Sequence, residues 1–509
     1  MRPDIRELRK RQLISVELQK SEPWARFFIA MRLFTLFVLI GFLTLMPWTQ
    51  PFWLASPWVA QEHDGQRLVQ MALFFCVALA SLETTWGSAR ATHKWPITQG
   101  AGPIKIATPA IAFFVLSSVE AQRPPWAFLE VVLFGGIVML AWLLATAQPR
   151  QREWVWAAAL TGVGLFSITT VFATVLGMAQ GLPPLVVKAI PGYSNVRHWN
   201  HVQVAAIPLM IGAIWYWRTS RPITWIGTAS VVSCVALLWT TGGRAASIAL
   251  VGSAMLLGLL LGRKAVPLLL RWTYYVFWGV LLGMALLQWL PQMLGIPAEQ
   301  LLLARPITTS SESARLELWA LALAMAFEHP WLGVGPMHFA NHPNPIAAHP
   351  HNIYVQLAAE WGFPTAFVLI GAAVFVMWQM VRRLRQLPAD HEALYIGMVL
   401  WWGCAAVMID GLFSGNFVMP MSQVWIATLL GLTWAWWRST SPPSGASAAE
   451  ASVLPRAALV LWCVVSAAAL IWTAIMFLER QTHLHGAPET WQGQVLEFAP
   501  RYWTMGWFE

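Results

Sequence analysis

The chain has 509 residues, of which 57% are hydrophobic and only 11% charged, and its formal net charge is +9 at pH 7. Apolar runs of about 20 residues recur along its whole length, which predicts an all-α polytopic membrane protein. A transmembrane β-barrel would need short segments of alternating polarity, and the sequence has none. The basic residues are spread over short loops, as membrane topology demands, so no nucleic-acid partner is expected.

About twelve or thirteen candidate spans follow one another, the lower number applying if one weak span is re-entrant. They cover residues 27–48, 67–86, 104–121, 126–147, 154–179, 201–217, 223–241, 245–262, 271–290, 364–381, 392–413, 421–438 and 456–478. This divides the chain into a basic cytoplasmic segment (1–26), the first nine spans (27–290), a large outer loop with short helices (291–363), the last four spans (364–478) and an outer tail (479–509).

Nine of the 32 Lys and Arg are expected on the outer face and the other 23 on the cytoplasmic side, a bias that follows the positive-inside rule. Three of the outer arginines stand in unusual local sequences. Arg197 lies in the polar stretch 188–201, Arg244 follows the Gly242-Gly243 turn, and Arg315 lies early in a helix predicted from Thr309 to Phe327. A guanidinium at a helix N-terminus is suited to bind phosphate. The alternative is that each arginine meets only lipid headgroups or a loop carboxylate.

A histidine-rich loop follows that helix, with His338, His342, His349 and His351 before Asn352. A neutral histidine suits proton acceptance near pH 7, whereas the His349-Pro350-His351 spacing could also bind a metal, or a loop histidine could simply lie on the surface.

The helix expected after His351 is too long for one straight span, so a break is predicted at Gly362-Phe363-Pro364. His351 is then expected to lie on a short helix hinged to the next span. Asp410, near the outer end of a later span, is a candidate for orienting an active-site partner.

Two motifs carry a resemblance to a known family. Residues 330–336 read Pro-Trp-Leu-Gly-Val-Gly-Pro, and His351-Asn352 is followed by nine residues, Gly362, two residues and Thr365. Together they resemble the signature of the O-antigen ligase/polymerase superfamily, and Gly-Gly-Arg at 242–244 and Ser-Ala-Arg at 313–315 resemble its paired outer-face arginines.

The resemblance implies an inverting, metal-independent glycosyltransferase of the bacterial inner membrane, with no cofactor and an active site facing the periplasm. The donor would be a glycan on undecaprenyl pyrophosphate, and the acceptor lipid A-core, with pilin or a growing glycan as alternatives. The family pattern selects His351 as the base and leaves His349 as a second candidate. Arg244 and Arg315 would hold the pyrophosphate, and Arg197, His201, His349 and Asn352 are candidates for substrate contact.

A transporter or flippase for a lipid-linked substrate is the competing class, since it also needs many spans and arginines near the membrane. Such proteins tend to show internal repeats and paired broken helices near the midplane. Here the polar residues gather on one face with a single large outer loop, which favours an enzyme working at that surface.

Overall fold

The computed structural model describes residues 23–49, 62–82, 113–184, 190–193, 195–297, 310–342, 346–441 and 456–486. Within these ranges the regular structure is helical, apart from one isolated bridge between Ile190 and Tyr193. Eight helical segments of this part are long and apolar enough to cross a membrane. The predicted all-α polytopic fold is therefore confirmed. Most of the expected N-terminal segment and tail, and residues 298–309 and 343–345 of the outer loop, lie outside the described residues.

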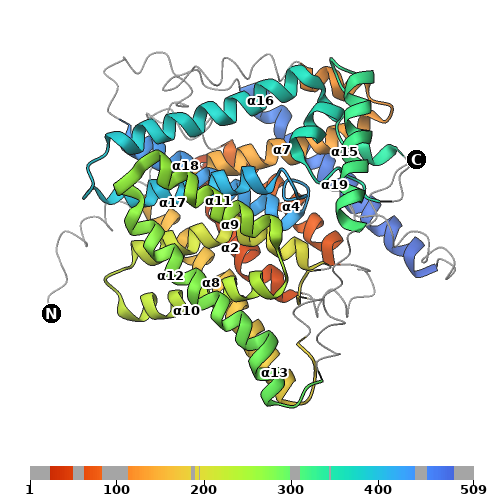
Figure 1. Ribbon diagram of the computed structural model, residues 1–509. Helices are drawn as coiled ribbons and strands as arrows, with labels where there is room; N and C mark the ends of the chain where they lie inside the picture. Colours follow the sequence, from red (N-terminus) through yellow and green to blue (C-terminus); the bar gives the residue numbers. More distant parts are fainter. Residues whose placement is uncertain are drawn as a thin grey trace.

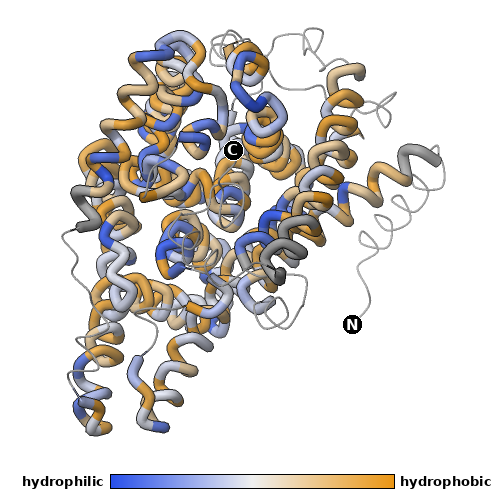
Figure 2. Tube along the Cα trace, turned by 90° about the vertical axis from the view of Figure 1, so that its right-hand side faces the viewer, coloured by the Kyte–Doolittle hydropathy of each residue, from blue (hydrophilic) through white to orange (hydrophobic). Residues whose placement is uncertain are grey.

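The helices lie side by side in a bundle (Figure 1). The long helices are α2 (Pro23–Leu45), α4 (Glu62–Ser81), α7 (Pro124–Ala145), α8 (Pro149–Ala179), α9 (Val196–Tyr216), α10 (Arg221–Thr240), α11 (Arg244–Leu261), α12 (Val266–Met284), α15 (Ser310–Glu328), α16 (Ile353–Gln386), α17 (Glu392–Asp410), α18 (Pro420–Thr440) and α19 (Arg456–Gly486). The π-helical turn η5 (Ala285–Trp289) and α13 (Leu290–Met293) prolong α12. Hydrophobic residues predominate along these helices (Figure 2).

Helix α9 is the centre of the bundle. It packs against α8, α10, α11, α17 and α18, and nearly every side chain from Trp199 to Ala213 is buried. A helix that is apolar on almost all sides suits this central position, because it has no polar face to turn to water. The polar groups of α9 are concentrated in its first turns, and these turns contribute to the candidate active site.

The helix ends follow from residues that the sequence provides. Proline occupies the first turn of α7, α8, α10, α12 and α18, where its missing N–H costs no hydrogen bond. The side chains of Asn195 and Asn352 cap α9 and α16 by accepting hydrogen bonds from backbone N–H groups. The predicted helix ending at Phe327 is observed as α15, which ends at Glu328.

Helix α16 breaks where the sequence predicts it. Gly362 has φ 77° and ψ 161°, outside the helical region, so α16 consists of two helical pieces joined at this residue. A Cβ at Gly362 would lie 2.2 Å from the carbonyl oxygen of Trp331, so the turn after α15 passes directly against the break. The amide of Phe363 also donates to the Pro330 carbonyl at 2.9 Å, which pins the two segments together.

Several predicted spans begin a few residues after the observed helices, as they do for α4, α8 and α9. The span predicted at 67–86 is α4, which begins at Glu62 and therefore brings a polar first turn into the bundle. Of the span predicted at 104–121, residues 113–120 are helical and residues 104–112 lie outside the described part of the chain.

Candidate active site

His351 lies immediately before the N-cap of α16, not on the helix as predicted. Its φ is 53°, in the left-handed region that few side chains adopt, and its backbone N–H donates to His349 Nδ1 at 3.2 Å. The two imidazole rings are in contact, with centroids 4.0 Å apart. The helical prediction was wrong because Asn352 takes the N-cap position, so that α16 begins at Ile353, two residues after His351.

His349 and Asn352 fix the backbone on either side of His351. The ring of His349 is 1% exposed and packs against Gly415, where a Cβ would lie 2.4 Å from it. The side-chain oxygen of Asn352 accepts hydrogen bonds from the N–H groups of Tyr354 and Val355. Of the two adjacent histidines, His351 is therefore the more exposed and His349 is the buried one.

Arg315 comes from α15, which is tied directly to the histidine loop. Trp319 Nε1 donates to the Pro350 carbonyl at 2.9 Å. Residues four apart share a helix face, so Arg315 lies one turn before this contact on the side of α15 that faces the loop. Its guanidinium is half-buried and acts electrostatically on His351.

The other two outer-face arginines meet at the start of α9. Arg197 donates to the carbonyls of Gly242 at 2.7 Å and Thr241 at 3.2 Å, which holds the glycine turn against α9. That turn ends at Gly243, the N-cap of α11, so Arg244 is the first residue of α11, as predicted. The charges of Arg315 and Arg244 both act on Arg197, so the three guanidinium groups lie within electrostatic reach of one another.

A buried carboxylate and further histidines complete the cluster. His201, on the second turn of α9, has Nδ1 3.5 Å from Asp410 Oδ2, and Asp410 also accepts a hydrogen bond from Ser414 at 2.6 Å. Asp410 is fully buried at the end of α17. The ring of His198 lies 6.5 Å from that of His201 and 6.0 Å from that of His63, on α4.

His63 and His198 were missed by the sequence reasoning. His63 precedes the span predicted at 67–86, and only the earlier start of α4 brings it into the bundle. His198 lies within the polar stretch 188–201, but its type alone did not separate it from a surface histidine. Helical spacing to His201, three residues on, was the available signal.

The remaining loop histidines lie apart from this cluster. His338 Nε2 accepts from the Arg123 amide at 2.9 Å, and His338 Nδ1 lies 2.7 Å from the Pro336 carbonyl oxygen. His342 has Glu328 and His329 as its charged neighbours. Only the pair before α16 joins the arginines.

The electrostatic environment keeps His351 neutral. Burial, the positive charge of Arg315 and the nearby His201 lower the pKa of His351 to about 3. An imidazole with such a pKa holds a free lone pair at neutral pH, which is the form needed to accept a proton. The surrounding guanidinium groups favour an anion, so the cluster combines a proton acceptor with cations suited to a phosphate group.

Glu360 fixes the loop that carries these groups. Its carboxylate is fully buried and accepts hydrogen bonds from the Phe339 amide at 2.9 Å and from Gln356 at 3.3 Å. Its backbone carbonyl accepts from the Gly335 amide at 3.0 Å. These bonds tie the first piece of α16 to the segment that follows α15.

Comparison with known proteins finds similarity to O-antigen ligases. Residues 228–370 match the family model described as O-antigen ligase. That range contains Arg244, Arg315, the His349–His351 pair and the break at Gly362. The chain is also 27% identical over 417 residues to an O-antigen ligase of Pseudomonas aeruginosa strain PAO1, an alignment that covers 77% of this chain and 92% of the relative. These similarities, together with the helical membrane fold, support a relationship of this chain to the O-antigen ligase superfamily.

Proposed function

We propose that this protein transfers a glycan from undecaprenyl pyrophosphate to a hydroxyl of lipid A-core at the periplasmic face of the bacterial inner membrane. The observation that carries the proposal is the meeting of a neutral His351 with Arg315, Arg197 and Arg244. A lipid-linked pyrophosphate needs cations beside the membrane, and an acceptor hydroxyl needs a proton acceptor.

In the proposed reaction His351 accepts the proton of the acceptor hydroxyl as its oxygen attacks the anomeric carbon. The bond from this carbon to the phosphate oxygen breaks on the opposite face, so the configuration inverts. The electron pair leaves with the pyrophosphate, whose charge Arg244 and Arg315 stabilise. Guanidinium groups can supply this stabilisation where other enzymes use a metal ion, and general-base help is worth about 10²–10⁴ in rate.

The remaining groups have supporting roles in this proposal. Arg197 holds the turn that positions Arg244, and its position also suits contact with the substrate. The Asp410 carboxylate orients His201, with the Nδ1 proton facing the carboxylate and Nε2 left to accept a hydrogen bond from a substrate hydroxyl. His349 and Asn352 hold the backbone that presents His351.

The binding of an anion would also assist the base. The charge of Arg315 by itself opposes protonation of His351. A bound pyrophosphate places negative charge beside the same guanidinium and offsets this opposition. His351 is then a stronger base with the donor bound than without it, which couples proton acceptance to donor binding.

The test is reconstituted transfer by the purified protein. Undecaprenyl-pyrophosphate-linked glycan is supplied with lipid A-core or with pilin, in the presence of EDTA, and the products are resolved by mass. Glycosylated lipid A-core with release of undecaprenyl pyrophosphate is the expected result. Glycosylated pilin instead would reassign the acceptor, and movement of donor across vesicles without any transfer would favour the transporter class.

A further inference from the structure

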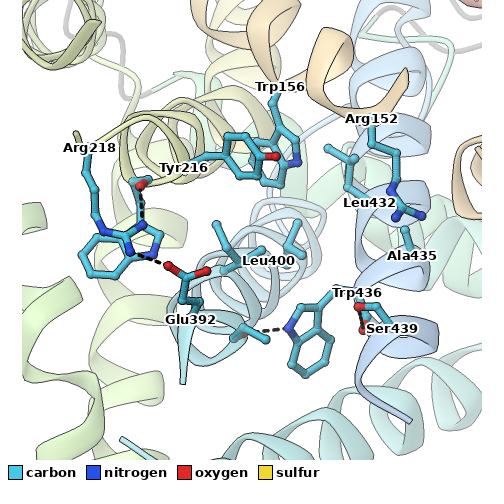
Figure 3. Close-up of a pocket in the computed structure, with 13 residues that line it drawn as sticks. Arg152, Trp156, Tyr216, Arg218, Glu392, Leu400, Leu432, Ala435, Trp436 and Ser439 are labelled. Carbon is cyan, nitrogen blue, oxygen red and sulfur yellow. Dashed lines mark hydrogen bonds and ion pairs between the residues drawn. The ribbon is translucent and has the colours of Figure 1, made fainter. Parts of the chain in front are cut away.

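A second polar site lies at the opposite end of the bundle from the histidine–arginine cluster. It is a cavity of about 470 Å³ between the first turns of α8 and α17 and the last turns of α9 and α18 (Figure 3). Helices α9 and α17 have 21 and 19 residues, so their length separates the two sites by roughly 30 Å. Nothing in the transfer reaction uses this cavity.

Arg152 is the cation of this cavity that lacks a counter-ion within the described part of the chain. Its half-buried guanidinium lines the cavity, and among the described residues it has no side-chain hydrogen bond or ion pair. Arg438 adds a second positive charge that acts on it. Two cations in a partly desolvated place repel each other unless an anion lies between or beside them.

The nearby carboxylates are already engaged elsewhere. Glu392 lies across the cavity from Arg152 and forms a 2.6 Å ion pair with Arg218 (Figure 3). Glu153 accepts a hydrogen bond from the Tyr216 hydroxyl at 2.7 Å. Arg218 and Arg271 also lie over the Trp215 ring at 4.5 and 4.4 Å from its centroid, which adds positive charge on this side. The surroundings of Arg152 therefore favour a negatively charged ligand.

The other walls of the cavity are apolar and aromatic. Trp156, Leu400, Leu432 and Trp436 line it, and each is buried to more than nine-tenths of its surface. The indole N–H of Trp436 is already bonded to the Ala393 carbonyl, so this ring offers mainly its apolar faces. A small hydrated anion would gain nothing from such walls, whereas an amphiphile would place its charged head at Arg152 and its carbon chain along the leucines.

The position of the cavity fits such a ligand. It opens at the ends of four long helices, of which α8 and α17 are apolar enough to cross a membrane, on the face where the positive-inside rule places the basic loops. Arg218 and Arg221 connect α9 to α10 there, and Lys264 and Arg271 flank the start of α12. Basic pockets between helices at this depth recognise the phosphate groups of anionic lipids.

We propose that this cavity binds the phosphodiester headgroup of an anionic glycerophospholipid, with Arg152 as its principal cation. The volume accommodates a headgroup and the first carbons of its chains, within the range usual for ligand sites. The proposal does not depend on the transferase assignment, because it concerns a different site and a binding equilibrium.

The test is native mass spectrometry of the full chain released from detergent, titrated with phosphatidylglycerol, with phosphatidylethanolamine, or with inorganic phosphate. The expected result is retention of phosphatidylglycerol in preference to phosphatidylethanolamine. Arg152→Gln should weaken this retention about tenfold, the usual cost of one lost charge-assisted hydrogen bond. Arg150→Gln is the matched control, because Arg150 lies two residues away on the same helix, is exposed, and lies outside the cavity.

A second variant keeps the test decisive if Arg152→Gln folds poorly. Ser439 is exposed at the rim of the cavity, so Ser439→Trp should narrow the opening and reduce lipid retention without disturbing the core. Equal loss for Arg150→Gln and Arg152→Gln would overturn the proposal, since it would reveal only general surface attraction. Equal retention of phosphatidylglycerol and phosphatidylethanolamine would also overturn the proposal. The same holds if Arg152→Gln abolishes the binding of inorganic phosphate but leaves lipid retention unchanged.

Discussion

Replacing His351 by asparagine removes the proposed base while keeping the unusual backbone. His351 has φ 53°, so an alanine there would add strain of about 1–2 kcal/mol that has nothing to do with catalysis. Asparagine adopts this region more readily than other residues, and it cannot act as a base. The rate of glycan transfer should therefore fall about 10²–10⁴-fold, while the melting temperature stays close to that of the unmodified protein.

The assay is single-turnover transfer from saturating lipid-linked donor, with donor binding measured separately. Donor affinity should change little, because the cations that hold the pyrophosphate remain in place. His342→Asn is the matched control, since His342 belongs to the same loop but has Glu328 and His329 as its charged neighbours, and it should transfer normally. Transfer by His351→Asn within about threefold of the unmodified rate would refute the role of a general base.

Three further predictions follow from the same geometry. Burial, Arg315 and His201 lower the pKa of His351 to about 3, so its imidazole stays neutral below the ordinary histidine range. The value of kcat/KM should therefore stay constant as pH falls from 7 to about 5. A decline in kcat/KM centred near pH 6.5 would contradict this environment. Arg315→Gln should lower kcat/KM roughly ten- to a hundredfold, and Arg315→Lys should recover only part of it because lysine lacks the bidentate fork; full activity of Arg315→Gln would exclude contact with the leaving pyrophosphate. Gly362→Ala should destabilise the protein by about 1–3 kcal/mol or more, measured as a loss of thermal stability. The reason is that φ of Gly362 is 77° and the new Cβ would meet the Trp331 carbonyl. The control Gly371→Ala should be tolerated, because nothing lies within 4 Å of a Cβ at that position.

Much of the membrane architecture is predictable because apolar length and helix breakers are local signals. The break in α16 follows from glycine and proline at 362–364, and the position of Arg244 follows from the two glycines before it. The pairing of His201 with Asp410 is not local, since these residues are far apart in sequence and meet only because α9 packs against α17. The approach of His63 to His198 likewise depends on the packing of α4.

The exact setting of His351 also escaped prediction. Residue pattern indicated a helix beginning near this position, and α16 does begin there, but capping by Asn352 leaves His351 outside it in a left-handed conformation. A shift of one or two residues at a helix end is below the resolution of sequence patterns, yet it decides which way a ring points. The charge effect of Arg315 on His351 depends on the packing of α15 against α16 and had no sequence signal of its own.

The central claim is that one cluster holds both the leaving group and the base. The most direct test is an experimental structure of the protein with an undecaprenyl-pyrophosphate-linked glycan bound. We expect the pyrophosphate beside Arg315 and Arg244, with the imidazole of His351 facing the anomeric carbon from the side opposite the leaving oxygen. Pyrophosphate bound instead at Arg152, or far from His351, would contradict it.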